Sequence, residues 1–150
     1  MTADNKNKVF PIFINLQNKN ILVVGFGNVA KRRIRTLLKF DCNIKVVAPE
    51  EIEEEFLGKI EYIKGEFKEK YLDDCFMVLG ATNDRNINQQ IYEKCKEKRI
   101  FVNICDKKDD CDFFFPAIFE DEEIIGALVS KHGDRHSLVK ETAKKIRGVL

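Results

Sequence analysis

A glycine loop that follows the first apolar run constrains the fold more than any other feature of the chain. Residues 25–30 read Gly-Phe-Gly-Asn-Val-Ala, between an apolar run at 20–25 and a segment at 28–40 whose apolar residues recur at helical spacing. In a strand–loop–helix unit of this form, the first glycine permits a tight turn and the second lets the backbone approach a pyrophosphate. The loop therefore predicts a dinucleotide site at Gly25 and Gly27 rather than a simple structural turn.

Apolar runs alternate with longer amphipathic stretches as far as about Cys105. After the first strand, this alternation predicts strands at 44–48, 60–64, 75–81 and 100–104, and helices at 28–40, 68–73 and 86–98. Strands separated by helices indicate a parallel sheet with right-handed crossovers. We therefore expect an α/β fold built on a Rossmann-like parallel sheet.

The pattern changes after Asp106. Two strands are predicted at 113–119 and 124–130, joined by an acidic turn at 120–123, and a charged amphipathic helix is predicted at 137–150. Two strands and one helix are too few to bury their apolar faces alone. We expect residues 1–112 to form the nucleotide-binding domain, and 113–150 to form a small α+β dimerisation segment that packs on that domain or on a second copy.

Charge and hydropathy exclude several classes of protein. The chain has 26 Lys+Arg and 25 Asp+Glu, and a net charge of +1 gives no general attraction for nucleic acid. The basic run at 31–35 is interpreted as a solvated helix face rather than a nucleic-acid patch. The apolar runs are far shorter than the ~20 residues of a membrane span, and residues 1–8 lack the apolar core of a secretory leader. We expect a cytoplasmic protein without nucleic-acid or membrane partners.

The cysteines and histidines do not indicate a metal site. No C-x-x-C pair occurs among the five cysteines, Cys42, Cys75, Cys95, Cys105 and Cys111. We interpret them as buried reduced thiols rather than as a disulfide framework or a zinc ribbon. His132 and His136 follow the last predicted strand without a third ligand at a suitable spacing, so surface or turn positions are favoured for both.

The end of the second strand bears on the choice between NAD and NADP. An acidic residue about 20 residues after the glycine loop commonly binds the adenosine ribose. Here the strand ends Val-Ala-Pro-Glu at 47–50, so its tip has no carboxylate and Glu50 is the nearest candidate. Glu50 can equally be a solvated charge in the acidic run at 50–55. In either case the run disfavours a 2′-phosphate, which predicts NAD.

Asp106 follows the fifth predicted strand, at the edge of the sheet where parallel sheets bind ligands. Two interpretations stay open from the residues alone. The carboxylate can serve chemistry at that edge, or it can cap a turn in the acidic stretch that includes Asp109, Asp110 and Asp112.

Several stretches, taken in order, resemble the precorrin-2 dehydrogenase and sirohydrochlorin ferrochelatase family, which includes the amino-terminal part of siroheme synthase. The matching stretches lie at 10–16, 21–30, 46–50, 80–83 with Asn88, 102–106, and 113–118 (Phe-Phe-Phe-Pro-Ala-Ile). The resemblance implies an NAD-dependent oxidoreductase that converts precorrin-2 to sirohydrochlorin in siroheme or cobalamin synthesis. It also implies a homodimer, and it leaves open a second, lyase activity with Fe²⁺ or Co²⁺ as substrate.

The resemblance also implies roles for single residues. Asp106 matches the family's catalytic aspartate, and Ser130 matches a serine near the tetrapyrrole pocket. The residues that match cofactor contacts, in addition to the two glycines, are Asn28, Val29, Pro49, Glu50 and Thr82. The sequence departs from the family at Phe26, where a third glycine is common, and at 131–137, which replace a more usual Gly-Gly-x-Ser-Pro-like turn. Members of the family typically continue into a further helical region, which we do not expect within these 150 residues.

A function from another class is also considered. An NAD-binding regulatory module without catalysis uses the same glycine loop and dimerises, but it needs no catalytic acid. An acidic residue at the tip of the second strand would favour it, and this chain has Ala48 there. The Asp106 segment and the stretch at 113–118 favour the enzyme.

Overall fold

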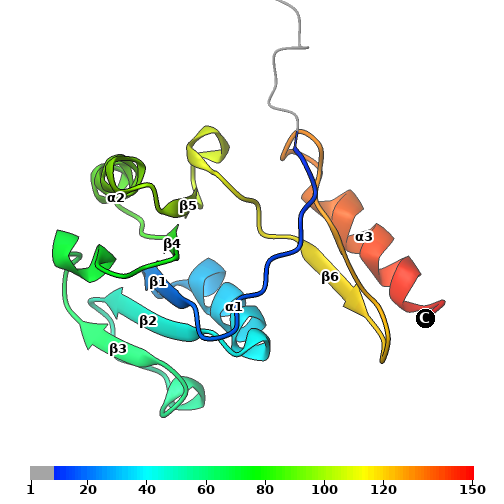
Figure 1. Ribbon diagram of the computed structural model, residues 1–150, viewed down its shortest axis with the longest axis horizontal. Coiled ribbons are helices and arrows are strands. Elements are labelled where there is room, and N and C mark those ends of the chain that lie inside the picture. The colour runs from blue at the N-terminus through cyan, green and yellow to red at the C-terminus, as the bar shows by residue number, and fades with distance from the viewer. Residues whose placement is uncertain (1–8) are drawn as a thin grey trace, which may run out of the picture. The chain divides into compact units, whose positions relative to one another are not determined.

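The computed structural model describes residues 9–150 and divides them into two compact units, shown in Figure 1. One unit is Asn15–Phe113, and the other combines residues 9–14 with Phe114–Leu150. Residues 9–14 were expected in the nucleotide-binding domain, whereas the structure groups them with the carboxyl-terminal unit. The expectation about a secretory leader at 1–8 lies outside the described residues. None of the helices within residues 9–150 combines the length and the apolar composition that a membrane span requires.

The first unit is a five-stranded parallel sheet with the order β3-β2-β1-β4-β5. Its strands are β1 (Asn20–Val24), β2 (Asn43–Ala48), β3 (Glu61–Lys64), β4 (Met77–Gly80) and β5 (Phe101–Ile104). The order reverses at β1, so the chain moves in one direction to β3 and then in the other to β5. This is the Rossmann-like arrangement expected from the alternation of strands and helices.

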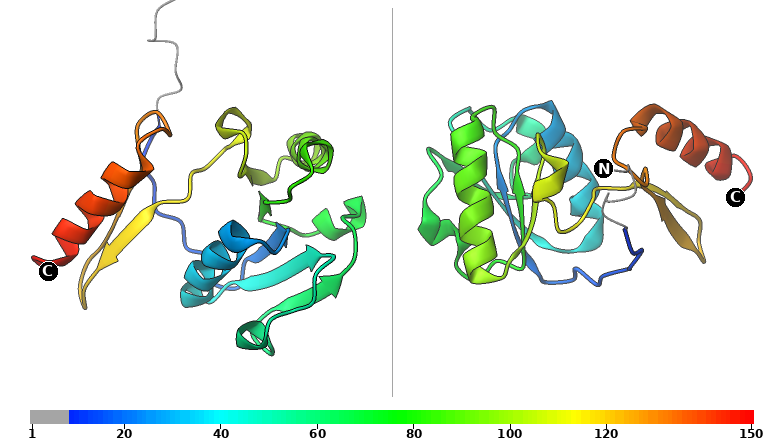
Figure 2. Two further views of the ribbon diagram at one scale, coloured as in Figure 1. Left: turned by 180° about the vertical axis from the view of Figure 1, so that it is seen from behind. Right: turned by 90° about the horizontal axis from the view of Figure 1, so that it is seen from above.

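Two helices cover the sheet, and the views in Figure 2 place them on opposite faces. They are α1 (Asn28–Leu37), which connects β1 to β2, and α2 (Arg85–Lys98), which connects β4 to β5. Right-handed crossovers that run in opposite directions from β1 require opposite faces. Helix α1 buries Ala30, Ile34 and Leu37, and α2 buries Ile91 and Cys95 beside Asn88. The predicted helix at 68–73 is a 3₁₀ turn, Glu69–Leu72.

The core of this unit consists of strand residues that are buried on both faces. Leu22, Val23, Val46, Val47 and Val78 have no exposed surface. Continuous apolar runs of this kind are typical of a parallel sheet covered by helices. The arrangement fixes the carboxyl ends of all five strands at one edge, and this edge carries the candidate site.

The second unit contains β6 (Ala117–Glu120), β7 (Ile125–Leu128) and α3 (His136–Arg147). The two strands pair antiparallel, and the Arg147 guanidinium donates hydrogen bonds of 2.6 and 3.1 Å to the carbonyl of Ile118. The first strand was expected at 113–119, but it begins at Ala117, because residues 112 and 113 hydrogen-bond back to β5 and Pro116 has no N–H to donate. Among the described residues of this unit, only Ala143 is fully buried.

Candidate cofactor-binding and active site

The carboxyl edge of the sheet gathers most of the residues that the sequence singled out. The loops after β1, β2, β4 and β5 all begin at this edge because the four strands are parallel and adjacent. They carry the glycine loop, Pro49 with Glu50, Thr82 and Asp106, respectively. Ser130 lies in the other unit and is described within it.

The two loop glycines meet different surroundings. Gly25 has a φ of +113°, and a Cβ at this position would clash with the carbonyl oxygen of Ala81, so the tight turn after β1 requires glycine. Gly27 has an ordinary φ of −80°, and nothing lies within 4 Å of where its Cβ would be. Gly25 is therefore needed by the fold, whereas Gly27 leaves open space beside the backbone.

Gly27 is also the N-cap of α1, and no side chain caps the first turn of this helix. The first backbone N–H groups of a helix have no partner within the helix, and the helix dipole favours an anion beside them. Asn28 and Val29, which begin the helix, are exposed. The open space at Gly27 and the uncapped helix end fit the pyrophosphate of a dinucleotide, as the motif predicts.

The segment after β2 is linked to the glycine loop by aromatic side chains. Phe26 is 3% exposed and packs edge to face against Phe56 and Tyr62, with ring centroids 5.3 and 5.1 Å apart. The Tyr62 hydroxyl donates a 2.7 Å hydrogen bond to the carbonyl of Glu50. Burial is the main cause that raises the pKa of Tyr62, and the charges of Glu50 and Glu51 raise this pKa further. The departure at Phe26 therefore supplies a packing contact that fixes the loop against residues 50–62.

The acidic run at 50–55 is largely neutralised by lysine and arginine. Ion pairs join Glu53 to Lys31 and Glu51 to Lys64, and the Arg35 Nε donates a 3.0 Å hydrogen bond to Glu55. The hydrogen bond from Arg35 lowers the pKa of Glu55. Three of the five glutamates in the run are therefore paired, so the run does not act as a set of bare carboxylates.

The basic run on α1 is not the solvated face that we expected. Besides the ion pairs of Lys31 and Arg35, the Arg33 guanidinium turns inward and donates a 2.7 Å hydrogen bond to the Asn103 side chain. Asn103 is 3% exposed and in turn donates to the carbonyl of Phe113. Burial lowers the pKa of Arg33. Three of the four cations therefore connect α1 to neighbouring segments.

Thr82 lies in the turn between β4 and α2, where buried Asn88 organises the backbone. The Thr82 hydroxyl donates a 2.6 Å hydrogen bond to Asn88 Oδ1, and Asn88 Nδ2 donates back to the carbonyl of Thr82 at 3.1 Å. Asp84 caps α2 by accepting the N–H groups of Asn86 and Ile87, so the helix begins at Arg85, one residue before the predicted start. Thr82 thus has a structural role beside Gly25, whatever it contributes to a cofactor.

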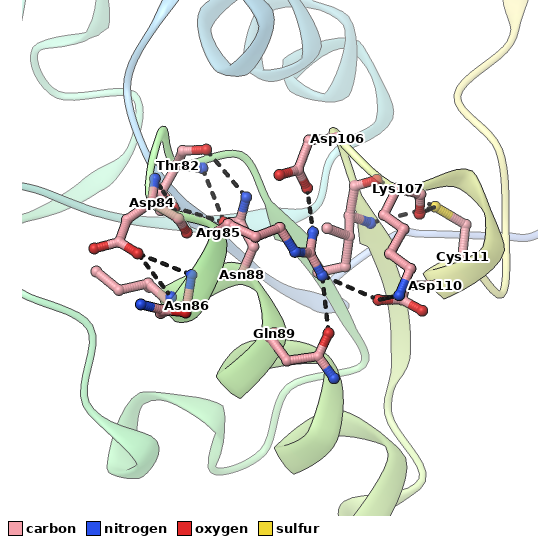
Figure 3. A network of polar contacts seen from close by, with 12 residues as sticks. Thr82, Asp84, Arg85, Asn86, Asn88, Gln89, Asp106, Lys107, Asp110 and Cys111 are labelled. Atoms are coloured by element: carbon pink, nitrogen blue, oxygen red, sulfur yellow. Dashed lines mark hydrogen bonds and ion pairs between the residues drawn. The ribbon is translucent and has the colours of Figure 1, made fainter.

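Asp106 is half exposed and its carboxylate accepts a 2.7 Å hydrogen bond from Arg85, as Figure 3 shows. The Arg85 guanidinium also donates to Gln89 Oε1 at 2.9 Å and to Asp110 Oδ2 at 3.3 Å. Asp110, whose side chain is only 8% exposed, lies 3.7 Å from the Lys107 ammonium. Two partners besides Asp106 therefore orient Arg85, and Arg85 holds the Asp106 carboxylate at the sheet edge.

This network bears on the turn-capping interpretation of Asp106 and adds one residue. Asp110, in the same acidic stretch, is buried and ion-paired. The carboxylate that accepts a backbone N–H in this loop is Asp112, which bonds to Val102 at 3.1 Å, whereas Asp106 contacts a side chain. Sequence reasoning missed Arg85, because the only signal was its position one residue after the helix cap Asp84 and one helical turn before Gln89.

The cysteines are free thiols, but they are not uniformly buried as expected. Cys95 lies in the core, and burial raises its pKa to about 12. Cys105, which directly follows β5, is exposed. Partial burial and the neighbouring Asp106 carboxylate raise the pKa of Cys105.

Ser130 organises the turn before α3. Its hydroxyl oxygen accepts the backbone N–H groups of Asp134 and Arg135 at 3.3 and 3.2 Å. The hydroxyl also lies 3.3 Å from Asp134 Oδ1. Of the residues that depart from the family pattern, 131–135 thus form a turn that closes on Ser130, and 136–137 begin α3.

Comparisons with known proteins point to a domain that binds a nicotinamide dinucleotide. The family described as "putative NAD(P)-binding" matches residues 12–117. The probable multifunctional siroheme biosynthesis protein HemA of Ruminiclostridium josui is 46% identical over 144 residues, which are 93% of this chain and 28% of that protein. A siroheme synthase of Buchnera aphidicola is 39% identical over 93% of this chain and 30% of its own length. The chain thus spans less than a third of these relatives.

A solved structure extends the likeness to three dimensions. "SirC, precorrin-2 dehydrogenase" superposes with a TM-score of 0.77 and 27% identity, over 95% of this chain and 71% of that chain. The match of the family pattern covers more than half of the chain and includes the glycine loop, the Thr82 turn and Asp106. The chain therefore belongs to the putative NAD(P)-binding family.

Proposed function

We propose that this chain catalyses the NAD-dependent dehydrogenation of precorrin-2 to sirohydrochlorin. The observation that carries the proposal is the half-exposed Asp106 carboxylate, held by Arg85 at the same sheet edge as the open glycine loop. The similarity to siroheme synthases and to a precorrin-2 dehydrogenase supplies the substrate class. The proposed cofactor contacts are Gly25, Gly27, Asn28, Val29, Pro49, Glu50 and Thr82.

The proposed chemistry assigns proton transfer to Asp106. Oxidation of precorrin-2 removes a hydride and a proton, and the nicotinamide, when bound, supplies the hydride acceptor. The Asp106 carboxylate accepts the proton, and Arg85 keeps the carboxylate oriented toward the edge of the sheet. Because the substrate is rich in carboxylates, the exposed cations of the loop after β5 are proposed to attract it. Ser130 is proposed as a further substrate contact.

A matched pair of substitutions tests the role of Asp106. Asp106→Asn keeps the shape and the hydrogen bond to Arg85 but accepts a proton poorly, so turnover should fall by about 10²–10⁴-fold. Asp109→Asn removes a charge from an exposed residue in the same loop and should leave turnover unchanged. NAD affinity, measured by calorimetry, should be the same in both variants. Normal turnover of Asp106→Asn would refute the assignment, and binding of NAD without turnover by the parent would favour the regulatory module.

We also propose that the second unit mediates homodimerisation. Large apolar side chains of this unit are exposed, including Phe10, Phe13, Ile124, Leu138 and Val149. A two-stranded ribbon with one helix has too little buried surface to be stable on its own. A second copy supplies the missing surface in the commonest way for a soluble protein.

Metal insertion is kept as a second candidate activity on the family resemblance. Fe²⁺ or Co²⁺ would be a substrate, and removal of the pyrrole N–H protons would again need a base such as Asp106. Incubation of sirohydrochlorin with Fe²⁺ and the parent protein, compared with Asp106→Asn, tests this activity. A rate equal to that without protein would exclude it.

A further inference from the structure

One cation next to the glycine loop is held by a carboxylate from the segment after β2. Lys31, in the second turn of α1, forms an ion pair with Glu53. Its ammonium nitrogen also lies 5.0 Å from the centroid of the Phe26 ring, in the glycine loop itself. The Lys31 side chain is only 18% exposed, whereas that of Glu53 is 46% exposed. Lys31 is therefore fixed beside the loop, and Glu53 covers it from the solvent side.

This ion pair lies between the two segments that flank the adenosine ribose of a dinucleotide in a Rossmann-like domain. The glycine loop follows β1, and its Gly25 N–H donates a 2.9 Å hydrogen bond to the carbonyl of Val47 near the end of β2. Residues at the end of the second strand commonly contact the ribose 2′-hydroxyl, and a nearby cation accommodates a 2′-phosphate. Lys31 is a cation within reach of the Phe26 ring, and Phe26 packs against Tyr62, which binds the Glu50 carbonyl.

Two other cations in this region are engaged farther from the loop. Arg35 lies one helical turn beyond Lys31, is paired with Glu55 and stacks over the Phe56 ring at 5.5 Å. Lys64, at the end of β3, is paired with Glu51. Lys31 is thus the cation that contacts the glycine loop directly, through Phe26.

We propose that Glu53 determines the preference for NAD over NADP by neutralising and holding Lys31. The inference rests on the proposed function in that it needs a dinucleotide at the glycine loop. A 2′-phosphate brings close to two negative charges, which need a cation with free hydrogen-bond donors. In the parent, Glu53 already occupies Lys31, so the phosphate must compete with a fixed carboxylate. Selectivity then comes from one salt bridge, which withholds from a 2′-phosphate the cation beside the glycine loop.

Glu53→Gln tests the inference by releasing Lys31 without changing the size of the side chain. Affinities of NAD, NADP and 2′,5′-ADP are measured by calorimetry at low salt. The affinities for NADP and 2′,5′-ADP should each rise about tenfold, because one hydrogen bond to a charged group strengthens binding by roughly tenfold or more. NAD affinity should stay within about twofold, because NAD has no 2′-phosphate.

Two further variants separate this mechanism from a general change of charge. Glu54→Gln removes the same charge from the neighbouring exposed residue, which forms no ion pair among residues 9–150, and it should not improve NADP binding. Lys31→Met combined with Glu53→Gln should abolish the gain. The inference is overturned if Glu53→Gln and Glu54→Gln bind NADP alike, if the gain persists without Lys31, or if the parent prefers NADP. A parent that binds neither dinucleotide would instead overturn the proposed function, and the inference with it.

Discussion

Gly27→Asp separates binding from stability at one position. Gly27 is the N-cap of α1, and nothing lies within 4 Å of where its Cβ would be, so an aspartate side chain fits without displacing a neighbour. Asp is among the best N-cap residues, and its carboxylate would accept the N–H groups of the first turn. The same groups are those that a pyrophosphate needs. The substituted side chain thus replaces the ligand at the helix end.

The two effects have opposite signs and different sizes. Replacement of Gly by Asp at an N-cap changes stability by only a few tenths of a kcal/mol, in the favourable direction here. Loss of two backbone hydrogen bonds to a charged pyrophosphate costs about 3 kcal/mol or more, before repulsion between the charges is added. Each 1.4 kcal/mol is a factor of ten, so NAD affinity should fall by at least about 100-fold.

Calorimetric titration with NAD gives the affinity of each variant, and unfolding in urea gives the stability of the same preparation. Gly25→Ala is the matched contrast, because its φ of +113° and its approach to the Ala81 carbonyl make any side chain costly. That variant should lose about 1–3 kcal/mol of stability or fail to fold. NAD affinity unchanged in Gly27→Asp would place the pyrophosphate elsewhere. Unfolding of Gly27→Asp would show that the space beside Gly27 is not open.

Three other predictions concern the catalytic network, the thiols and the second unit. Arg85→Met should lower turnover severalfold and leave NAD affinity unchanged. Arg85→Lys should recover part of the lost turnover, because a cation again contacts Asp106. Equal rates for the two variants would argue against a positioning role of Arg85. Iodoacetamide at pH 8 should label exposed Cys105 before Cys95, because the raised pKa of Cys95, about 12, leaves almost no thiolate. Mass spectrometry of peptides measures the order of labelling, and faster labelling of Cys95 would contradict the prediction. Light scattering at micromolar concentration should give the mass of a dimer, and a monomer mass would count against the proposed interface.

The order of the strands and helices could be predicted because their signals are local. The buried runs of β1, β2, β4 and β5 and the helical spacing of α2 are repeated patterns that tertiary contacts do not override. The start of the strand expected at 113–119 was predicted wrongly, because it depends on contacts that are not local. Three consecutive phenylalanines favour a strand, but Asp112 and Phe113 are held against β5 by bonds that the local sequence does not contain.

The candidate site could be predicted only in its backbone part. The motif located the glycine loop, and the end of a buried strand located Asp106, because both follow from strand and loop geometry. The side-chain partners join residues far apart in sequence, such as Arg85 with Asp106 and Lys31 with Glu53. From the sequence alone, a run of like charges is interpreted as a solvated face or a repulsive patch, because the segment that lies opposite it in the fold is not known. Here two ion pairs, Lys31 with Glu53 and Arg35 with Glu55, join the basic run to the acidic run.

The most direct test of the proposed function follows both products of one reaction. Purified protein is incubated with precorrin-2 and NAD in the absence of metal, and the absorbance of sirohydrochlorin and of NADH is recorded together. We predict equal amounts of the two products, and a much slower reaction with NADP at the same concentration. Sirohydrochlorin formed at the rate seen without protein, while NAD binds normally, would contradict the assignment of a dehydrogenase.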